Sequence, residues 1–307
     1  MSPVREQLRA WLFPPDNGFW LTLLRTGLGL QVILYTWSFR NDWFYFFPGS
    51  RFQVSQSGLG EIILSSETSW TPRIGWLVTA GDWAHLNQQV VLWGIWLVLL
   101  LSGCCVLAGF FSRLAAVMAW FLYLCSVKSG GLLAYGVDTF TTIGLFYLMI
   151  APLPDRFAVD SILWKPRLQD PERLGFHRRV LQLHLCLIYF FGGVSKSVGI
   201  DWWNGNSIWR ALTRPPFNLI APELLARSVP LLVALGIAVC LLETGYPIFI
   251  WIRRTRVPWL LGVLVMHLAI GLAMGLYLFA LIMIVLNLAA FAPARWLPMK
   301  NEFLQNA

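Results

Sequence analysis

The sequence predicts an all-α, polytopic integral membrane protein of about eight transmembrane helices. Apolar residues make up 57% of the 307 residues and charged residues only 12%, whereas soluble domains average about 25% charged residues. The mean hydropathy is +0.63. The apolar residues gather in long runs, and about 20 such residues suffice for a helix to cross a bilayer.

Eight runs qualify as candidate spans, and in chain order they are Gly18–Phe39, Gln88–Ala108, Ala115–Lys128, Thr139–Ala151, Val180–Val198, Val229–Ile252, Val257–Ala273 and Leu276–Phe291. The third and fourth runs are short, so they reach a spanning length only if flanking residues such as 130–137 are helical or buried in protein. The last two runs adjoin, and Gly271 and Gly275 offer a tight hairpin between them.

Two segments between the runs, 41–87 and 201–227, are rich in Trp and too apolar for solvated linkers. We expect both to be exoplasmic, to lie on the membrane surface and to cover the helices. An even number of spans places both termini on one side. Loops on that side carry more Lys and Arg than the loops opposite, and such an excess marks the cytoplasm. Both termini are therefore expected in the cytoplasm, with the chain in the plasma membrane or a bacterial inner membrane.

The net charge of +8 is spread over short loops, which fits membrane orientation better than a nucleic-acid-binding face. Residues 1–16 lack the apolar stretch of a signal peptide, so no cleaved leader is expected. The five cysteines lie inside apolar runs without a C-x-x-C pair, which argues against a disulfide framework or a zinc site. We predict no metal site and no nucleic-acid partner.

Ionisable residues inside spans are costly, and they mark function or deliberate pairing. At a rise of about 1.5 Å per helical residue, they form two layers. Arg25, His184 and Glu243 fall in the cytoplasmic half of the membrane. We expect an ion pair between Arg25 and Glu243, with Gln182 and His184 beside it. Its simplest role is to lock helices together, since an unpaired buried charge is strongly destabilising.

The second layer lies nearer the exoplasmic side and contains Asp138 and Lys196, with His267 near mid-membrane. Lys196 shares one helix face with Tyr189 and Gln182, because the three are spaced by seven residues. The small pair Gly192 and Gly193, next to that face, lets a helix or a flat ligand approach closely. A partly desolvated lysine here could act as a base or nucleophile, or it could simply extend to the headgroups.

Residues 181–196, LQLHLCLIYFFGGVSK, followed by DWWNG at 201–205, resemble a signature of the HTTM domain. That domain is the membrane part of the vitamin K-dependent γ-carboxylases, and its pattern is roughly Q-x-Q, an apolar stretch, Tyr, two small residues, Lys, then Trp and Gly. Further stretches resemble the family in the same order, namely Leu23–Leu30 with Arg25, Asp138 with Arg156–Ser161, and Glu243 with Arg253–Arg256 and His267. The resemblance covers residues 8–295 as a single domain.

In the carboxylases, a lysine deprotonates vitamin K hydroquinone. Oxygen then converts the quinone to an epoxide by way of a strong base, which removes a proton from a glutamate side chain before carbon dioxide adds. The resemblance places Lys196 at that lysine and implies a reduced vitamin K or menaquinol-type quinone as cofactor. His267 and Asp138 become candidates for orienting or proton-transfer roles in catalysis. The expected cofactor-binding residues are Tyr189, Gly192 and Gly193.

Two residues depart from the family pattern: Ser195 precedes Lys196 where carboxylases often have Lys-Lys, and His184 replaces the second glutamine. We also expect no extra-membrane domain after the last helix. The first hypothesis is therefore a quinol-dependent membrane enzyme that modifies an exoplasmic secreted peptide or lipid, with a possible partner protein. The alternatives are a non-enzymatic scaffold, immunity factor or peptide-maturation partner that keeps only the fold, and a small transporter.

Overall fold

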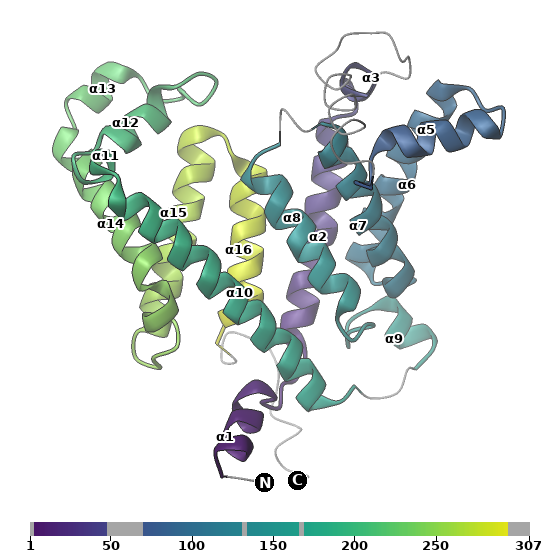
Figure 1. The fold of residues 1–307 in the computed structure, drawn as a ribbon, viewed down its shortest axis with the longest axis horizontal. Helices are drawn as coiled ribbons and strands as arrows, with labels where there is room; N and C mark the ends of the chain where they lie inside the picture. The colour runs from purple at the N-terminus through teal and green to yellow at the C-terminus, as the bar shows by residue number, and fades with distance from the viewer. Residues whose placement is uncertain (1–2, 48–69, 131–133, 166–168, 294–307) are drawn as a thin grey trace. The chain divides into compact units, whose positions relative to one another are not determined.

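The computed structural model describes residues 3–47, 70–130, 134–165 and 169–293, and in these ranges all regular structure is helical (Figure 1). The elements in chain order are α1 (Pro3–Leu12), α2 (Phe19–Ser38), α3 (Trp43–Phe46), α5 (Ile74–Trp83), α6 (Gln88–Ala108), α7 (Ser112–Ser129), α8 (Gly136–Ile150), α9 (Val159–Leu163), α10 (Pro171–Val198), α11 (Ile200–Trp203), α12 (Asn206–Thr213), α13 (Pro222–Ala226), α14 (Val229–Phe249), α15 (Arg256–Met274) and α16 (Tyr277–Phe291).

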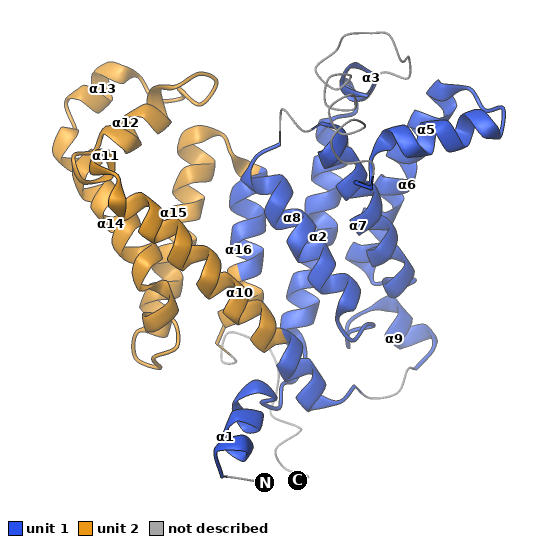
Figure 2. Cartoon of the chain, in the orientation of Figure 1, with its two compact units in different colours: residues 1–177, 278–286 blue, residues 178–277, 287–307 orange. Residues whose placement is uncertain are grey.

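The chain forms two compact units (Figure 2). Unit 1 comprises residues 1–177 and 278–286, and unit 2 comprises residues 178–277 and 287–307. Helices α10 and α16 contribute residues to both. Each unit has buried polar residues of its own, and each is described separately below.

Helix α2 carries much of the core of unit 1, where it packs against α6 and α8. Its buried stripe includes Leu21, Leu24, Leu28 and Val32, at the spacing of one helix face. The helices approach closely at Gly29, where a Cβ atom would lie 2.5 Å from the backbone nitrogen of Leu107. Small residues permit such backbone contact between apolar helices.

In unit 2, close packing joins α10, α11 and α12 to α14. A Cβ atom at Gly193 would lie 2.4 Å from the backbone nitrogen of Thr244, and one at Gly236 would lie 2.1 Å from the Trp202 carbonyl oxygen. Because neither position admits a side chain, glycine sets the distance between these elements. The expectation that segment 201–227 covers the helices agrees with the contacts of α11, α12 and α13 with α14.

The predicted apolar runs agree closely with the helices. The run Gly18–Phe39 folds as α2, and the two short runs form α7 and α8, which begin about three residues earlier than predicted. The predicted break between the last two runs is present: α15 ends at Met274, and Gly275 has a φ of 72°. Much of segment 41–87 lies outside the described residues, which include α3 and α5.

Four helices in the described ranges are long and apolar enough to cross a membrane: α6, α10, α14 and α15. Helices α8 and α16 are shorter but apolar. The all-helical class and the membrane character of the prediction are therefore supported, whereas the number of spans is not fixed by these lengths.

We predict that Gly193→Ala destabilises the protein by about 1–3 kcal/mol, the usual cost of overpacking, because the new methyl group meets the backbone of Thr244. Thermal unfolding of the purified protein in detergent measures this. Gly94→Ala is the matched control, since a Cβ atom there meets nothing within 4 Å. Equal unfolding midpoints in the two variants would contradict the packing argument.

Candidate functional site

Lys196 and Glu243 form an ion pair in unit 2. Lys196 lies in the last turn of α10, and its Nζ is 2.5 Å from Oε2 of Glu243 on α14. The lysine side chain is 29% exposed and the glutamate 10%. The amine is thus partly desolvated and held by a carboxylate. Lys196 is partly buried, as expected. Its ion-pair partner Glu243 was not predicted from the sequence.

Gly192 lies directly against this pair. A Cβ atom at Gly192 would lie 3.2 Å from Glu243 Oε2 and 3.6 Å from Lys196 Nζ. The indole ring of Trp202 lies on another side of the amine, with Nζ 5.6 Å from the ring centroid, within the range of a cation–π interaction. A carboxylate, an aromatic ring and a residue without a side chain therefore surround the amine.

The predicted pair between Arg25 and Glu243 is wrong. Glu243 binds Lys196, and Arg25 binds Asp155, with which it forms a hydrogen-bonded ion pair. The prediction estimated depth by counting residues along single helices, which does not reveal where two helices cross. The close approach of Gly193 to Thr244 brings the end of α10 against the C-terminal part of α14, so Lys196 meets Glu243.

Arg25 has a structural position in unit 1, where the side chain is 2% exposed. Its Nη1 donates to the carbonyl oxygens of Val106 (2.9 Å) and Leu107 (2.5 Å), at the end of α6. Thr22 donates to Asp155 Oδ1 at 2.6 Å. A cation is favourable at a helix C-terminus because the last carbonyl groups lack partners within the helix. Arg25 therefore ties α2 to α6 and to the loop that holds Asp155.

Asp160 performs the complementary task at the start of α7. Its carboxylate accepts hydrogen bonds from the backbone nitrogens of Phe111 (2.8 Å) and Ser112 (2.6 Å). An anion at a helix N-terminus satisfies free N–H groups and is favoured by the helix dipole. The α6–α7 turn thus has a cation at one helix end and an anion at the other.

A chain of four buried side chains runs through unit 2. The Tyr246 hydroxyl donates to Asn287 Oδ1 at 2.7 Å, and Asn287 Nδ2 donates to the Tyr189 oxygen at 2.8 Å. The Tyr189 oxygen lies 2.7 Å from His267 Nε2. Because that oxygen already accepts from Asn287, its own proton is available to Nε2. In the arrangement where the Tyr189 hydroxyl donates to Nε2, a neutral His267 carries its proton on Nδ1.

Sequence reasoning missed Asn287 and Tyr246. Both lie inside apolar runs and neither side chain is charged near neutral pH, so a charged residue within a span does not reveal them. An amide within a long apolar helix is the signal that could have found Asn287, because a fully buried side chain of this kind needs hydrogen-bond partners. Asn287 is 0% exposed.

The Gln182 side chain, on α10, contacts the C-terminal end of α16 and does not lie beside Arg25 as predicted. Its Nε2 donates to the Ala290 carbonyl oxygen at 2.6 Å, and Arg178 Nε donates to the same oxygen at 3.0 Å. These side chains satisfy a terminal carbonyl group of α16. His184 is half-buried on α10.

Of the three predicted catalytic residues, Lys196 and His267 belong to unit 2 and Asp138 to unit 1. Asp138 is 6% exposed in the first turn of α8. It accepts from the Tyr135 backbone nitrogen at 2.9 Å, and the Tyr123 hydroxyl is 3.4 Å away. Across the described part of the chain, no cluster of three or more His, Cys, Asp or Glu residues could hold a metal ion.

These features define the class: an all-helical membrane protein with ion pairs and hydrogen-bonded polar side chains buried between helices. The HTTM domain model matches residues 76–296, most of the chain. The chain therefore belongs to the HTTM family, as the resemblance predicted. Searches of curated proteins and of solved structures gave no match.

We predict that Asp155→Ala destabilises the protein by about 3–5 kcal/mol, because it leaves the Arg25 guanidinium buried without its counter-charge. Denaturant unfolding in detergent, followed by tryptophan fluorescence, measures the change. Asp82→Ala removes an exposed aspartate and should stay within about 0.5 kcal/mol of wild type. A loss no larger in Asp155→Ala than in Asp82→Ala would contradict the structural role of the pair.

The hydrogen-bonded chain predicts that neutral His267 carries its proton on Nδ1 and that Tyr189→Phe abolishes this single tautomer. Nitrogen-15 NMR of histidine-labelled protein tests this, since there are only 4 histidines and His267→Gln identifies the signal. Phe190→Leu alters an adjacent side chain that is 40% exposed and should leave the tautomer unchanged. Wild-type protein with the proton on Nε2 would overturn the donor direction.

Proposed function

We propose that the chain is a quinol-dependent membrane enzyme related to the membrane domain of the vitamin K-dependent γ-carboxylases. Lys196 is its base, and a reduced vitamin K or menaquinol-type quinone is its cofactor. The observation that carries the proposal is the Lys196–Glu243 pair: a partly exposed amine 2.5 Å from a buried carboxylate. Membership of the HTTM family supports the relation to the carboxylases.

The pair offers a way to make a charged lysine into a base. A single proton that moves from Nζ to Oε2 turns an ammonium and a carboxylate into a neutral amine and a neutral acid. In apolar surroundings a neutral pair loses less solvation than two ions do. The amine can then accept a proton from a weak acid, and the resulting ammonium would stabilise the anion left behind. Glu243 thus acts as the proton store for Lys196.

The residues around the amine fit a flat, lipid-soluble quinol, which would supply an acidic hydroxyl group and reducing electrons when bound. Gly192 contributes no side chain next to the pair. Trp202 offers an aromatic face beside Nζ. The proposal keeps Gly192 as a cofactor-binding residue.

Tyr189 and Gly193 support the site in a different way. The Tyr189 ring stacks on Tyr246 with centroids 4.1 Å apart, and its hydroxyl is engaged by Asn287 and His267. The backbone of Thr244 occupies the space that a side chain at Gly193 would need. We therefore propose that both position α10 and His267, and that His267 orients the reacting groups or transfers a proton.

The proposed topology has eight spans with both termini in the cytoplasm, and residues 8–295 form one functional domain in the plasma membrane or a bacterial inner membrane. The proposed substrate is an exoplasmic secreted peptide or a lipid, and we propose that a partner protein supplies a peptide substrate. The distribution of Lys and Arg among the loops supports this orientation.

A non-enzymatic scaffold or peptide-maturation partner is the second candidate. The same ion pair favours it, because a short contact between α10 and α14 can hold two helices together without any chemistry. The two candidates differ in what Lys196 contributes. If the protein is an enzyme, loss of Lys196 abolishes turnover while the protein stays folded. If the protein is a scaffold, loss of Lys196 weakens the packing between α10 and α14.

Oxygen uptake and epoxide formation by the purified protein with a menaquinol-type hydroquinone test the proposal. We expect Lys196→Ala to lower uptake by at least ~100-fold, the lower range for loss of a general base. Lys128→Ala, which removes an exposed lysine near the end of another helix, should keep wild-type uptake. Folding of each variant is checked by circular dichroism.

Three results would count against the enzyme. Equal uptake in wild type and Lys196→Ala would remove Lys196 as the base. No uptake by folded wild-type protein would favour the scaffold. Lys196→Ala could also unfold and yet take up oxygen once refolding or a bound ligand restores its structure. That result would assign the pair to packing alone.

A further inference from the structure

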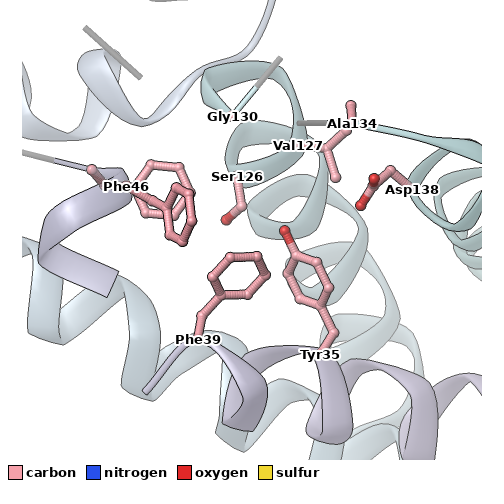
Figure 3. A pocket seen from close by; sticks show the side chains of 9 residues that line it. Tyr35, Phe39, Phe46, Ser126, Val127, Gly130, Ala134 and Asp138 are labelled. Atoms are coloured by element: carbon pink, nitrogen blue, oxygen red, sulfur yellow. The ribbon is translucent and has the colours of Figure 1, made fainter. Parts of the chain in front are cut away.

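Unit 1 contains a cavity of about 40 Å³ between α2, α3, α7 and the start of α8 (Figure 3). A buried water needs about 10–15 Å³, so the cavity holds a group larger than one water molecule. Four aromatic side chains, a serine and a carboxylate line most of it, namely Tyr35, Phe39, Phe46, Phe47, Ser126 and Asp138. We call it the Asp138 pocket.

The Tyr35 hydroxyl faces this pocket without a hydrogen-bond partner among the residues that the structure describes. The residue is 5% exposed, and its ring is fixed by contacts with Tyr123 and Phe39, whose centroids lie 4.5 and 5.0 Å away. Figure 3 shows the hydroxyl and the Asp138 carboxylate directed toward the same space. The Tyr35 oxygen is therefore free to accept a hydrogen bond from a polar ligand in the pocket.

Asp138 places a carboxyl group in the pocket. Its Oδ2 accepts from the Tyr135 backbone nitrogen at 2.9 Å, and its Oδ1 accepts a longer hydrogen bond from the Tyr123 hydroxyl at 3.4 Å. Within the described ranges no lysine or arginine forms an ion pair with it. A carboxylate that is 6% exposed is expensive to keep charged without a counter-ion. A bound cation would remove that cost.

The aromatic rings complete a site for such a cation. Phe39 and Phe46 pack edge to face with centroids 5.3 Å apart, and aromatic faces attract ammonium groups. We propose that the Asp138 pocket binds a primary ammonium group, which donates hydrogen bonds to Asp138 and to the Tyr35 oxygen and lies against Phe39 and Phe46. The N–H donors matter here, because both polar groups can accept them and a quaternary ammonium has none.

The ammonium group can come from a free alkylamine or from an aminophospholipid headgroup, and the test separates them. Purified, delipidated full-length protein is titrated with ethylammonium chloride, at constant ionic strength, while its thermal unfolding is followed. A ligand that binds only the native state raises the midpoint in proportion to ln(1 + [L]/Kd). Nanodiscs of phosphatidylethanolamine and of phosphatidylglycerol provide the lipid arm.

We expect ethylammonium to raise the midpoint of wild type, and tetramethylammonium at the same concentration to have a smaller effect. Asp138→Asn should weaken ethylammonium binding at least ~10-fold, since about 1.4 kcal/mol corresponds to a factor of ten in affinity. Asparagine still accepts from the Tyr135 nitrogen, so the start of α8 is preserved. Asp42→Asn, at an exposed position, is the matched control and should bind as wild type does.

Tyr35→Phe provides a second test that does not depend on Asp138→Asn folding, because it removes only the hydroxyl oxygen; weaker ethylammonium binding supports the proposal. A midpoint shift in phosphatidylethanolamine nanodiscs but not with ethylammonium would identify the lipid headgroup as the source. No shift with either ligand, or equal shifts in wild type, Asp138→Asn and Tyr35→Phe, would overturn the proposal. The readout is binding, so it is independent of the proposed quinol chemistry.

Discussion

A charged side chain between apolar helices is stable only when the fold brings it a partner, and two such pairs organise this protein. Arg25 and Asp155 have side chains 2% and 1% exposed, and the guanidinium also reaches two carbonyl oxygens of α6. Lys196 and Glu243 are 29% and 10% exposed. The first pair is buried and fully hydrogen-bonded, which suits a structural role in holding helices together. The second remains accessible, which is a requirement for chemistry.

Both pairs depend on positions where no side chain fits. The contact of Gly29 with the backbone of Leu107 accompanies the approach of α2 to α6, and that of Gly193 with Thr244 accompanies the approach of α10 to α14. Lys and Arg side chains are long, but a salt bridge inside the bundle still requires backbones close enough for both ends to meet. Close helix packing at glycine therefore lets each of these buried charges reach its partner.

The sequence predicted the helices well because apolar length is a local property, as the agreement of Gly18–Phe39 with α2 shows. It also singled out Lys196, since a charge beside two glycines is visible in one segment. The partners could not be predicted in the same way. Asp155 lies in a loop outside every apolar run, and the meeting of Lys196 with Glu243 depends on where two helices cross. Asn287 was overlooked because it carries no charge.

The Lys196–Glu243 contact reconciles the structural and catalytic interpretations of the site. An ammonium donates to a carboxylate, and after one proton moves, a carboxylic acid donates to an amine; a hydrogen bond joins Nζ and Oε2 in both states. The link between α10 and α14 can therefore persist while the amine changes from acid to base. A lysine that only locked the helices would need no access, yet 29% of its side chain is exposed. That exposure supports the proposal that the pair holds the helices and exchanges protons at the same atoms.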